Sequence, residues 1–439
     1  MLKKSAILLA AISLSASALA ACGNNSQSGK GDAAGPGTSK EPVELSVYNN
    51  AGITEEQFKE KFGNYIAEKL PHVTIKFIPK DKSVSLTEMV SSGSTKIDIY
   101  MDSIGQIGLK SSLLDLGLQY DMSDLVKKHN VDLSRFEPTT IDAIKLMGGL
   151  YGLPISNSTM VMYYNKDLFD KFGVPYPKDG MTWEEVTELS KKMTRSESGV
   201  QYVGYSTSIV HYLRMNPLSL VNVDPKSLKA NFESDQWRQL VQTTLVDPMS
   251  GSGYKDKVKE LEKKWYKVPY VDEFSKNKDT AMFSYIYADS AWLKDVNWDV
   301  VSMPALKEKP KVGAQSYPSY MFITSTSEKK DAAMEVIKLF ISDEYQTSFS
   351  KSGGITSLKN EEIKKVFGQD TPDKTKNIKN AVFYNQFAPA TPKTPFDTHV
   401  EADVRAQIPK LIMGDTDINT ALRTAQEAVN KKIETESVK

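Results

Sequence analysis

Cysteine and histidine are scarce in this sequence of 439 residues, and neither sign of charge is in excess. The single cysteine, Cys22, rules out an intramolecular disulfide and a cysteine-rich metal site. The four histidines (His72, His129, His211 and His399) show no H-x-x-x-H spacing, which excludes a zinc enzyme of the zincin type. The 55 basic residues balance the 55 acidic ones, so the chain as a whole has no basic character that would favour nucleic acid.

The remaining composition is that of an ordinary globular protein. Hydrophobic residues make up 40% of the chain and charged residues 25%, with 25 glycines and 20 prolines. At about 150 residues per domain, the length allows two or three domains, each large enough for its own core. The sequence also contains no P-loop and no G-x-S-x-G motif. We therefore expect a non-catalytic protein that uses neither a cofactor nor a metal.

Residues 1–21 have the form of a secretory signal. Lys3 and Lys4 precede an apolar stretch of small and aliphatic residues, 5–21. The stretch ends in Leu-Ala-Ala-Cys, which resembles the lipobox of bacterial lipoproteins. This resemblance implies cleavage before Cys22 and lipidation of Cys22, which would anchor the protein at the extracytoplasmic face of the cell membrane. The alternative is a conventional signal cleaved within the alanine series, which would leave a free thiol.

Residues 22–41 are expected to form a tether between this anchor and the folded part. After the cysteine they are mostly Gly, Ser, Asn and Pro without apolar periodicity, and they cannot bury enough surface to offset their chain entropy. The folded part is expected to begin near Pro42. No later window approaches the length of a membrane span.

The hydrophobic pattern of the folded part predicts an α/β class. Apolar residues alternate over 43–47 and again over 73–77, which is typical of strands. Between them, Thr54 and Gln57 form a capping-box pattern, and apolar residues then recur every four positions up to Leu70. A strand, a helix and a strand in this order favour a parallel sheet covered by helices.

Two neighbouring segments carry a resemblance to a known family. Residues 149–154 read GLYGLP, and residues 162–169 read MYYNKDLF. This pattern resembles the family-1 extracellular solute-binding proteins of ABC importers, the group that includes maltose-binding protein. Six further segments keep the order of that family, although Lys96 stands where proline is usual: 92–101 (SGSTKIDIYM), 172–186 (FGVPYPKDGMTWEEV), 279–292 (DTAMFSYIYADSAW), 299–305 (DVVSMPA), 328–342 (EKKDAAMEVIKLFIS) and 350–357 (SKSGGITS).

The resemblance implies a two-lobe fold of the type II periplasmic-binding-protein kind, with a mainly parallel sheet flanked by helices in each lobe. The first lobe would comprise residues 42–157 and 301–325, and the second residues 158–300 and 326–439. A ligand cleft would lie between the lobes and close by hinge bending. The expected function is capture of a carbohydrate, an oligosaccharide in particular, by a monomer that delivers it to the membrane subunits of an ABC permease. No nucleic acid is expected as a partner.

Polar residues after two predicted strands are candidate ligand contacts in the first lobe. Asn49 and Asn50 follow the first strand, at the carboxyl edge where ligands lie in open α/β sheets. Asp102 and Ser103 follow the strand at 97–101, and the family commonly uses this loop. The alternatives are ordinary loop chemistry for the Asn pair and a helix N-cap for the Asp-Ser pair.

Further candidates lie near the implied crossings between the lobes. Asn157 follows the GLYGLP segment and could face the cleft or bond to the hinge backbone. Tyr205 could offer its ring and hydroxyl to the cleft, or be a half-buried strand residue. Gln315 and Tyr317 lie in a polar loop that the family often uses for cleft contacts, where Gln315 suits hydroxyl binding; an ordinary loop is the alternative.

Trp292 is the aromatic residue that we expect to stack on a sugar face. It occupies the aromatic position in the family's loop, and a core contact at the rim is the alternative. Asp289 precedes it by three residues and could accept hydrogen bonds from hydroxyls.

Three other functions stay open at this point. The same fold could bind a peptide, a polyamine or a metal ion, but arginine is scarce and no acidic cluster falls on the strand-edge loops. The chain could instead be a sensor subunit that presents its ligand to a membrane receptor. A secreted glycoside hydrolase would need a pair of carboxylates across the scissile bond, and no segment resembles a hydrolase motif.

Overall fold

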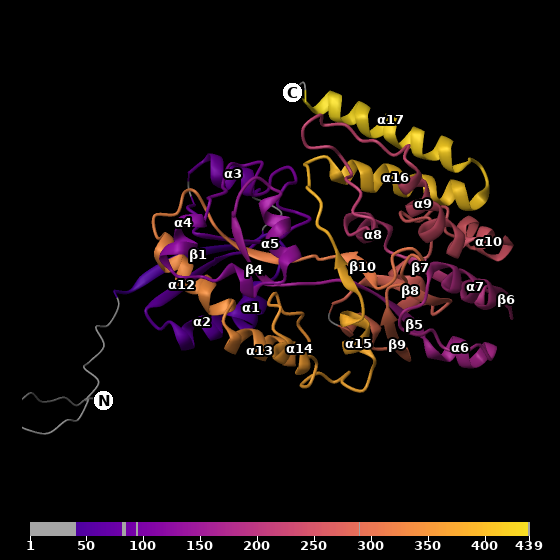
Figure 1. Cartoon of the computed structure of the whole chain (residues 1–439), viewed down its shortest axis with the longest axis horizontal. Coiled ribbons are helices and arrows are strands. Elements are labelled where there is room, and N and C mark those ends of the chain that lie inside the picture. Colours follow the sequence, from indigo (N-terminus) through magenta and orange to yellow (C-terminus); the bar gives the residue numbers. More distant parts are fainter. Residues whose placement is uncertain (1–40, 81–84, 94, 289, 438–439) are drawn as a thin grey trace, which may run out of the picture. The chain divides into compact units, whose positions relative to one another are not determined.

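Two mixed β-sheets with helices packed against them form the body of the protein in the computed structural model (Figure 1). The structure describes residues 41–80, 85–93, 95–288 and 290–437. The predicted signal peptide, Cys22, the tether up to residue 40 and Asp289 therefore lie outside the described residues. Pro42–Lys439 form one compact unit.

The first sheet has five strands in the order β2-β1-β3-β11-β4. Strand β1 runs parallel to β2 and β3, whereas β11 is antiparallel to both β3 and β4. The carboxyl ends of β1, β3 and β4 therefore meet at one edge of the sheet, beside the first residue of β11. The strand bounds are Val43–Asn49 (β1), Val73–Ile78 (β2), Ile99–Ser103 (β3), Gly152–Ser156 (β4) and Ser319–Ile323 (β11).

The second sheet has the order β6-β7-β8-β5-β9. Strands β7 and β8 are parallel, and β5 runs antiparallel to β8 and β9. Each sheet is thus mixed rather than wholly parallel: β11 is the reversed strand of the first sheet, and β5 and β6 are the reversed strands of the second. The bounds are Met160–Asn165 (β5), Arg195–Glu197 (β6), Val200–Thr207 (β7), Thr280–Ile286 (β8) and Trp298–Ser302 (β9); β10 (Val312–Gln315) pairs with β12 (Gln386–Ala388) outside both sheets.

Local sequence signals explain where several helices begin. The capping box predicted at Thr54 forms, and a second capping box forms at Thr182, where Glu185 stands three residues on. The helices are α1 (Glu55–Phe58), α2 (Asn64–Lys69), α3 (Leu86–Ser91), α4 (Ser123–Lys128), α5 (Pro138–Lys145), α6 (Lys166–Phe172), α7 (Trp183–Met193), α8 (Ile209–Arg214), α9 (Asp235–Val241), α10 (Ser252–Glu260), α11 (Val271–Ser275), α12 (Lys330–Phe340), α13 (Asp343–Lys351), α14 (Glu361–Lys365), α15 (Ile378–Phe383), α16 (Asp397–Met413) and α17 (Ile418–Ser437). Short 3-10 helices are η2 (Leu133–Arg135), η4 (Asp247–Met249) and η5 (Ser290–Leu293), and π-helical turns are η1 (Lys59–Gly63) and η3 (Gln242–Val246).

The chain crosses from the first sheet to the second between β4 and β5 and returns between β9 and β11. These crossings fall close to the predicted lobe boundaries. Helix α12 differs from the prediction, which assigned residues 326–439 to the second lobe. It contacts β1, β4, β11 and α2, and it buries Val336 and Phe340 on the side of the first sheet. Figure 1 shows α12 among these elements. The spacing of the apolar residues in this segment indicates a helix, but it does not show which sheet the apolar face covers.

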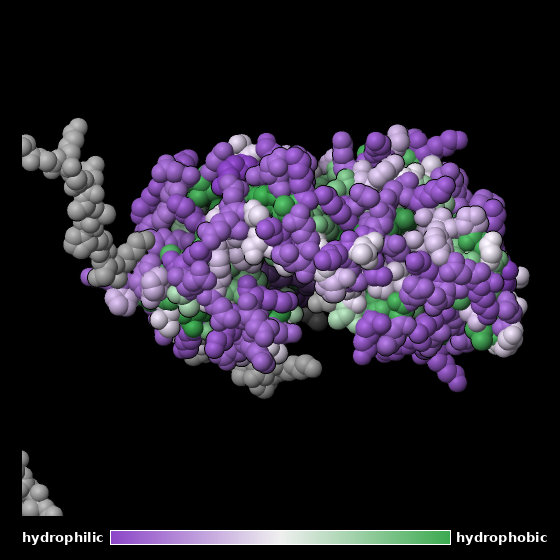
Figure 2. Space-filling model, turned by 90° about the horizontal axis from the view of Figure 1, so that it is seen from below, coloured by the Kyte–Doolittle hydropathy of each residue, from purple (hydrophilic) through white to green (hydrophobic). Residues whose placement is uncertain are grey.

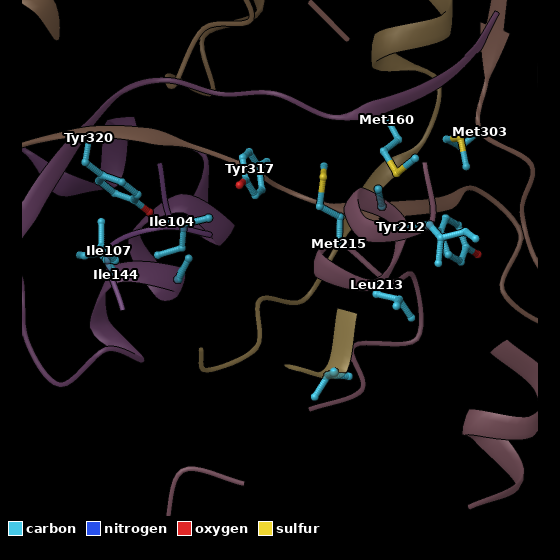
Figure 3. Packing of buried hydrophobic residues seen from close by; sticks show 14 of the residues in the cluster. Ile104, Ile107, Ile144, Met160, Tyr212, Leu213, Met215, Met303, Tyr317 and Tyr320 are labelled. Carbon is cyan, nitrogen blue, oxygen red and sulfur yellow. The ribbon is translucent and has the colours of Figure 1, made fainter. Parts of the chain in front are cut away.

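The main hydrophobic cluster joins the two sheets. Ile104, Ile107 and Tyr320 belong to the part near the first sheet, and Met215 belongs to the part near the second (Figure 3). Tyr317 lies between these two groups (Figure 3). A smaller cluster that includes Tyr163, Phe283 and Trp298 packs on the second sheet. The face shown in Figure 2 is mostly hydrophilic, with a recess near its middle. No helix in the part of the chain that the structure describes is long and apolar enough to cross a membrane.

Candidate functional site

Two adjoining cavities lie where the carboxyl edge of the first sheet meets the crossing to the second. The sheet-edge cavity has a volume of about 470 Å³, and the crossing cavity about 480 Å³. They share three lining residues, Lys61, Ser156 and Ser319. The sheet-edge cavity is also lined by Asn49, Asn50, Ala51, Ile53, Phe62, Lys80, Met101, Asp102, Ser103, Gln106, Ile155 and Tyr320. The crossing cavity is also lined by Asn157, Ser158, Tyr287, Ala288, Ser290, Trp298, Phe349, Ser352, Gly353, Gly354, Ile355, Thr371, Pro372, Asp373 and Ile378.

Asp102 is the central polar group of the sheet-edge cavity. Its side chain is 5% exposed, and its carboxylate accepts hydrogen bonds from Asn50 Nδ2 (2.7 Å), the Tyr100 hydroxyl (3.0 Å) and the Ser103 backbone N–H (2.8 Å). Burial raises the pKa of Asp102 to about 6, although these hydrogen bonds and the charge of Lys80 act in the opposite direction. The carboxylate is therefore held in a fixed position at the sheet edge, where it can accept further hydrogen bonds.

Asn49 and Asn50 hold the loop that follows β1. Asn49 Oδ1 accepts a hydrogen bond from the Ala51 N–H (2.8 Å), and its side chain is buried. The backbone carbonyl of Asn50 accepts a hydrogen bond from Lys80 Nζ (3.0 Å). The parallel pairing of β1 with β3 places both Asn residues beside Asp102 and Ser103, as predicted from the strand ends.

Asn157 lines the crossing cavity and also fixes the crossing itself. Its side-chain carbonyl accepts hydrogen bonds from the N–H groups of Ser158 (2.8 Å) and Tyr317 (3.1 Å). Its own N–H donates to Ile355 O (2.8 Å). Both alternatives from the sequence thus apply, because the residue bonds to the hinge backbone and also lines a cavity.

Aromatic faces line the crossing cavity beside these polar groups. Half-buried Tyr287 donates its hydroxyl hydrogen bond to Gly353 O (3.1 Å). The Phe349 ring lies so close to Gly354 that a Cβ there would be 2.3 Å from it, so this wall requires glycine. Asp373, which also lines the cavity, accepts a hydrogen bond from the Ser290 hydroxyl. Flat apolar faces next to carboxylate, amide and hydroxyl groups are suited to a polyhydroxylated ligand.

The other predicted contacts line neither cavity. Tyr205 has no exposed surface and packs edge-on against Trp183 (ring centroids 5.7 Å apart), so it is a core residue. Gln315 is 3% exposed, and its carboxamide bonds to Asn216 O (3.0 Å) and the Thr391 N–H (3.1 Å). Both side chains support the fold rather than line a cavity, because segments distant in the sequence cover them.

Trp292 and Tyr317 also line neither cavity. Trp292 is half-buried and packs edge-on against Tyr163 and Tyr285, with ring centroids 5.3 and 5.6 Å apart. Tyr317 is 9% exposed, with its hydroxyl 3.4 Å from Ser103 Oγ and 3.5 Å from an Arg214 nitrogen. Tyr317 thus supports a lining residue, Ser103, from behind. Asp289 lies outside the described residues.

Sequence reasoning missed several lining residues. Ser156 and Tyr287 could have been found, because each stands at the end of a strand whose end reaches the cavities. Lys61 and Asp373 gave no such signal, since one lies on the exposed side of a helix and the other in a loop far along the chain. Among the described residues, no group of three or more His, Cys, Asp or Glu side chains could hold a metal ion.

The fold and the cavities define a class of protein: two α/β lobes, joined by crossing strands, beside a polar recess that can take a small solute. The chain belongs to the bacterial extracellular solute-binding protein family, whose model matches residues 51–347. This membership confirms the resemblance found in the sequence. It also supports the expectation of a protein that binds a solute rather than an enzyme that transforms one.

Individual relatives agree with this assignment. A Brucella abortus protein described as a binding protein is 25% identical over 343 residues, which cover 73% of this chain and 77% of that protein. The maltodextrin-binding protein MdxE of Bacillus subtilis is 30% identical over 204 residues, covering 45% of this chain and 42% of MdxE. The ABC substrate-binding protein Lmo0181 of Listeria monocytogenes, solved in complex with cycloalternan, has the same fold with a TM-score of 0.64 and 19% identity, covering 90% of this chain and 100% of Lmo0181.

Proposed function

We propose that this chain is the solute-binding lipoprotein of an ABC importer and that its solute is a carbohydrate, specifically an oligosaccharide. The observation that carries this proposal is the pair of adjoining cavities that meet at Ser156 and Ser319. Each cavity has a volume within the range of about 300–1,000 Å³ that is usual for small-molecule sites. Two such spaces in contact suit a ligand of more than one sugar unit.

The chemistry of the lining suits sugar hydroxyls. Asp102, Asn50 and Asn157 offer planar polar groups, and the serines at the junction offer hydroxyls that both donate and accept. Tyr287 and Phe349 offer ring surface for the apolar faces of a sugar ring. We propose Asn49, Asn50, Asp102, Ser103 and Asn157 as ligand contacts, with hinge closure bringing the second lobe over them.

Relatives support the choice of carbohydrate over other solutes. MdxE is named for maltodextrin binding, and Lmo0181 was solved with the saccharide cycloalternan. Neither name decides which saccharide this chain takes. A peptide, polyamine or metal ion is a less suitable ligand for the cavities, because they contain two carboxylates, Asp102 and Asp373, offset by two lysines, Lys61 and Lys80.

The lipid anchor is the second part of the proposal. It rests on the sequence around Cys22 and places the protein at the extracytoplasmic face of the cell membrane, bound through its acylated cysteine and working with membrane permease subunits. Two or more acyl chains hold a protein on a membrane where one does not. Cells grown with a labelled fatty acid should incorporate the label into the wild-type chain and not into Cys22→Ala, and a wild-type chain without label would refute the anchor.

A thermal-shift screen of the chain from residue 23 tests the ligand class. The panel contains mono- and oligosaccharides, amino acids, peptides, polyamines and metal ions. A ligand at a hundred times its dissociation constant adds about 2.7 kcal/mol to the free energy of unfolding, which gives a readable shift. We expect shifts with one class of saccharide. A clear shift with a peptide, polyamine or metal, and none with any saccharide, would keep the fold and overturn the proposed ligand.

A further inference from the structure

Lys61 stands at the junction of the two cavities, where it lines both. Its side chain is exposed, and within the part of the chain that the structure describes its ammonium group makes no ion pair and no hydrogen bond. The two other residues common to both cavities, Ser156 and Ser319, are neutral. A ligand that spans both cavities would therefore lie beside the Lys61 ammonium group where the cavities meet.

The π-helical turn at Lys59–Gly63 explains why a lysine lies there. Phe58 and Ile66 flank the turn and are both buried, 3% and 1% exposed. On a regular α-helix, residues eight apart would point about 80° away from each other, because each residue turns the helix by about 100°. The extra residue of a π turn reduces that difference to about 20°, so both side chains reach the core. The same turn carries Lys61 and Phe62 along the cavities, and π turns often occur at functional sites.

The charges of the sheet-edge cavity leave Lys61 without a counter-ion. Its other charged residues are Lys80 and Asp102. Lys80 donates to the Asn50 carbonyl, and its charge acts on the Asp102 carboxylate. Asp102 already accepts hydrogen bonds from three partners, as described above. Two cations against one anion give this cavity a formal charge of +1. The crossing cavity adds the Asp373 carboxylate, which accepts a hydrogen bond from Ser290 rather than from Lys61, so Lys61 has no ion-pair partner among the described residues.

We propose that the bound saccharide carries an anionic group, a carboxylate or a phosphate ester, and that Lys61 is the specificity-determining residue that binds it. This inference rests on the proposed function and adds the ligand's charge to it. The cation would favour the charged ligand over a neutral one of the same shape, because a hydrogen bond to a charged partner contributes more than one between neutral groups.

Titration calorimetry with matched ligands tests the proposal. The probes are cellobiose against cellobiouronic acid, and glucose against glucuronate and glucose 6-phosphate, so that the carboxylate and phosphate arms are separate. The variants are Lys61→Gln and the charge-conserving Lys61→Arg. Lys59→Gln serves as the control, because Lys59 is exposed in the same π turn but lines neither cavity. Circular dichroism confirms that each variant is folded.

We expect an acidic saccharide to bind at least about tenfold more tightly than its neutral partner. Lys61→Gln should remove that preference, Lys61→Arg should keep most of it because the charge is conserved, and Lys59→Gln should leave it unchanged. Equal or tighter binding of the neutral partner, with no effect of Lys61→Gln, would overturn this inference and leave the carbohydrate function standing. Binding of none of these probes, together with no shift from any saccharide in the thermal-shift screen, would overturn both.

Discussion

The ionisation of Asp102 offers a quantitative test of the candidate site. Its pKa is raised from 3.8 to about 6, chiefly because the carboxyl group is buried. The native state therefore holds this proton more tightly than the unfolded chain does, and stability falls as the pH rises from about 4 to 6. A difference of roughly two pKa units corresponds to at most about 3 kcal/mol in the free energy of unfolding. Above pH 6 the full cost of the buried charge is present.

Urea unfolding of the wild type and of Asp102→Asn at pH 4.5 and 7.5 measures this cost. Other buried carboxyl groups titrate in both proteins, so the difference between the two free energies of unfolding isolates Asp102. We expect the wild type to lose about 2 kcal/mol relative to the variant as the pH rises across this range. Asp124→Asn is the control, because the Asp124 side chain is 94% exposed. A wild-type minus Asp102→Asn difference that is the same at both pH values would refute the reasoning about this site.

Three further predictions concern residues outside the cavities. Glu401 holds the buried Arg214 through two hydrogen bonds. In urea unfolding, Glu401→Gln should lower the free energy of unfolding by about 3 kcal/mol, because it leaves the Arg214 charge buried without its partner. The double replacement of Arg214 by Met and Glu401 by Leu removes both charges and should cost much less. Gly204→Ala would place a Cβ 2.1 Å from the Ser190 carbonyl oxygen, so we expect a loss of about 2 kcal/mol or more, and an unchanged melting temperature would contradict this packing. Trp292→Ala should lower the free energy of unfolding by about 1–3 kcal/mol, because the contacts of its ring with Tyr163 and Tyr285 are lost. Calorimetry should show an unchanged saccharide affinity, and weaker binding by a folded variant would show that Trp292 belongs to the site.

The sheet edge was predictable from the sequence because strand ends are local features. Alternating apolar residues located β1, the short buried strand expected at 97–101 overlaps β3, and parallel strands bring their carboxyl ends together. Asn50 and Asp102, fifty-two positions apart, were therefore both expected at one edge, and they are hydrogen-bonded at 2.7 Å. The capping box at Thr54 was likewise readable, since its partners are three residues apart.

Features that depend on what covers an element were not predictable. Tyr205 lies on β7, which α7 and α10 both contact, so the strand is covered and its tyrosine is buried. The π turn that carries Lys61 follows from the need of Phe58 and Ile66 to reach one core, which a helical pattern alone does not reveal. The sheet that receives α12 is likewise a tertiary choice.

The most direct test of the account is a crystal structure of the chain from residue 42 with the saccharide that gives the largest thermal shift. The account predicts sugar density across both cavities, with a hydroxyl within hydrogen-bonding distance of Asp102 and a ring against Tyr287 or Phe349. A saccharide bound away from Asp102, Ser156 and Ser319, with both cavities empty, would contradict the proposed site.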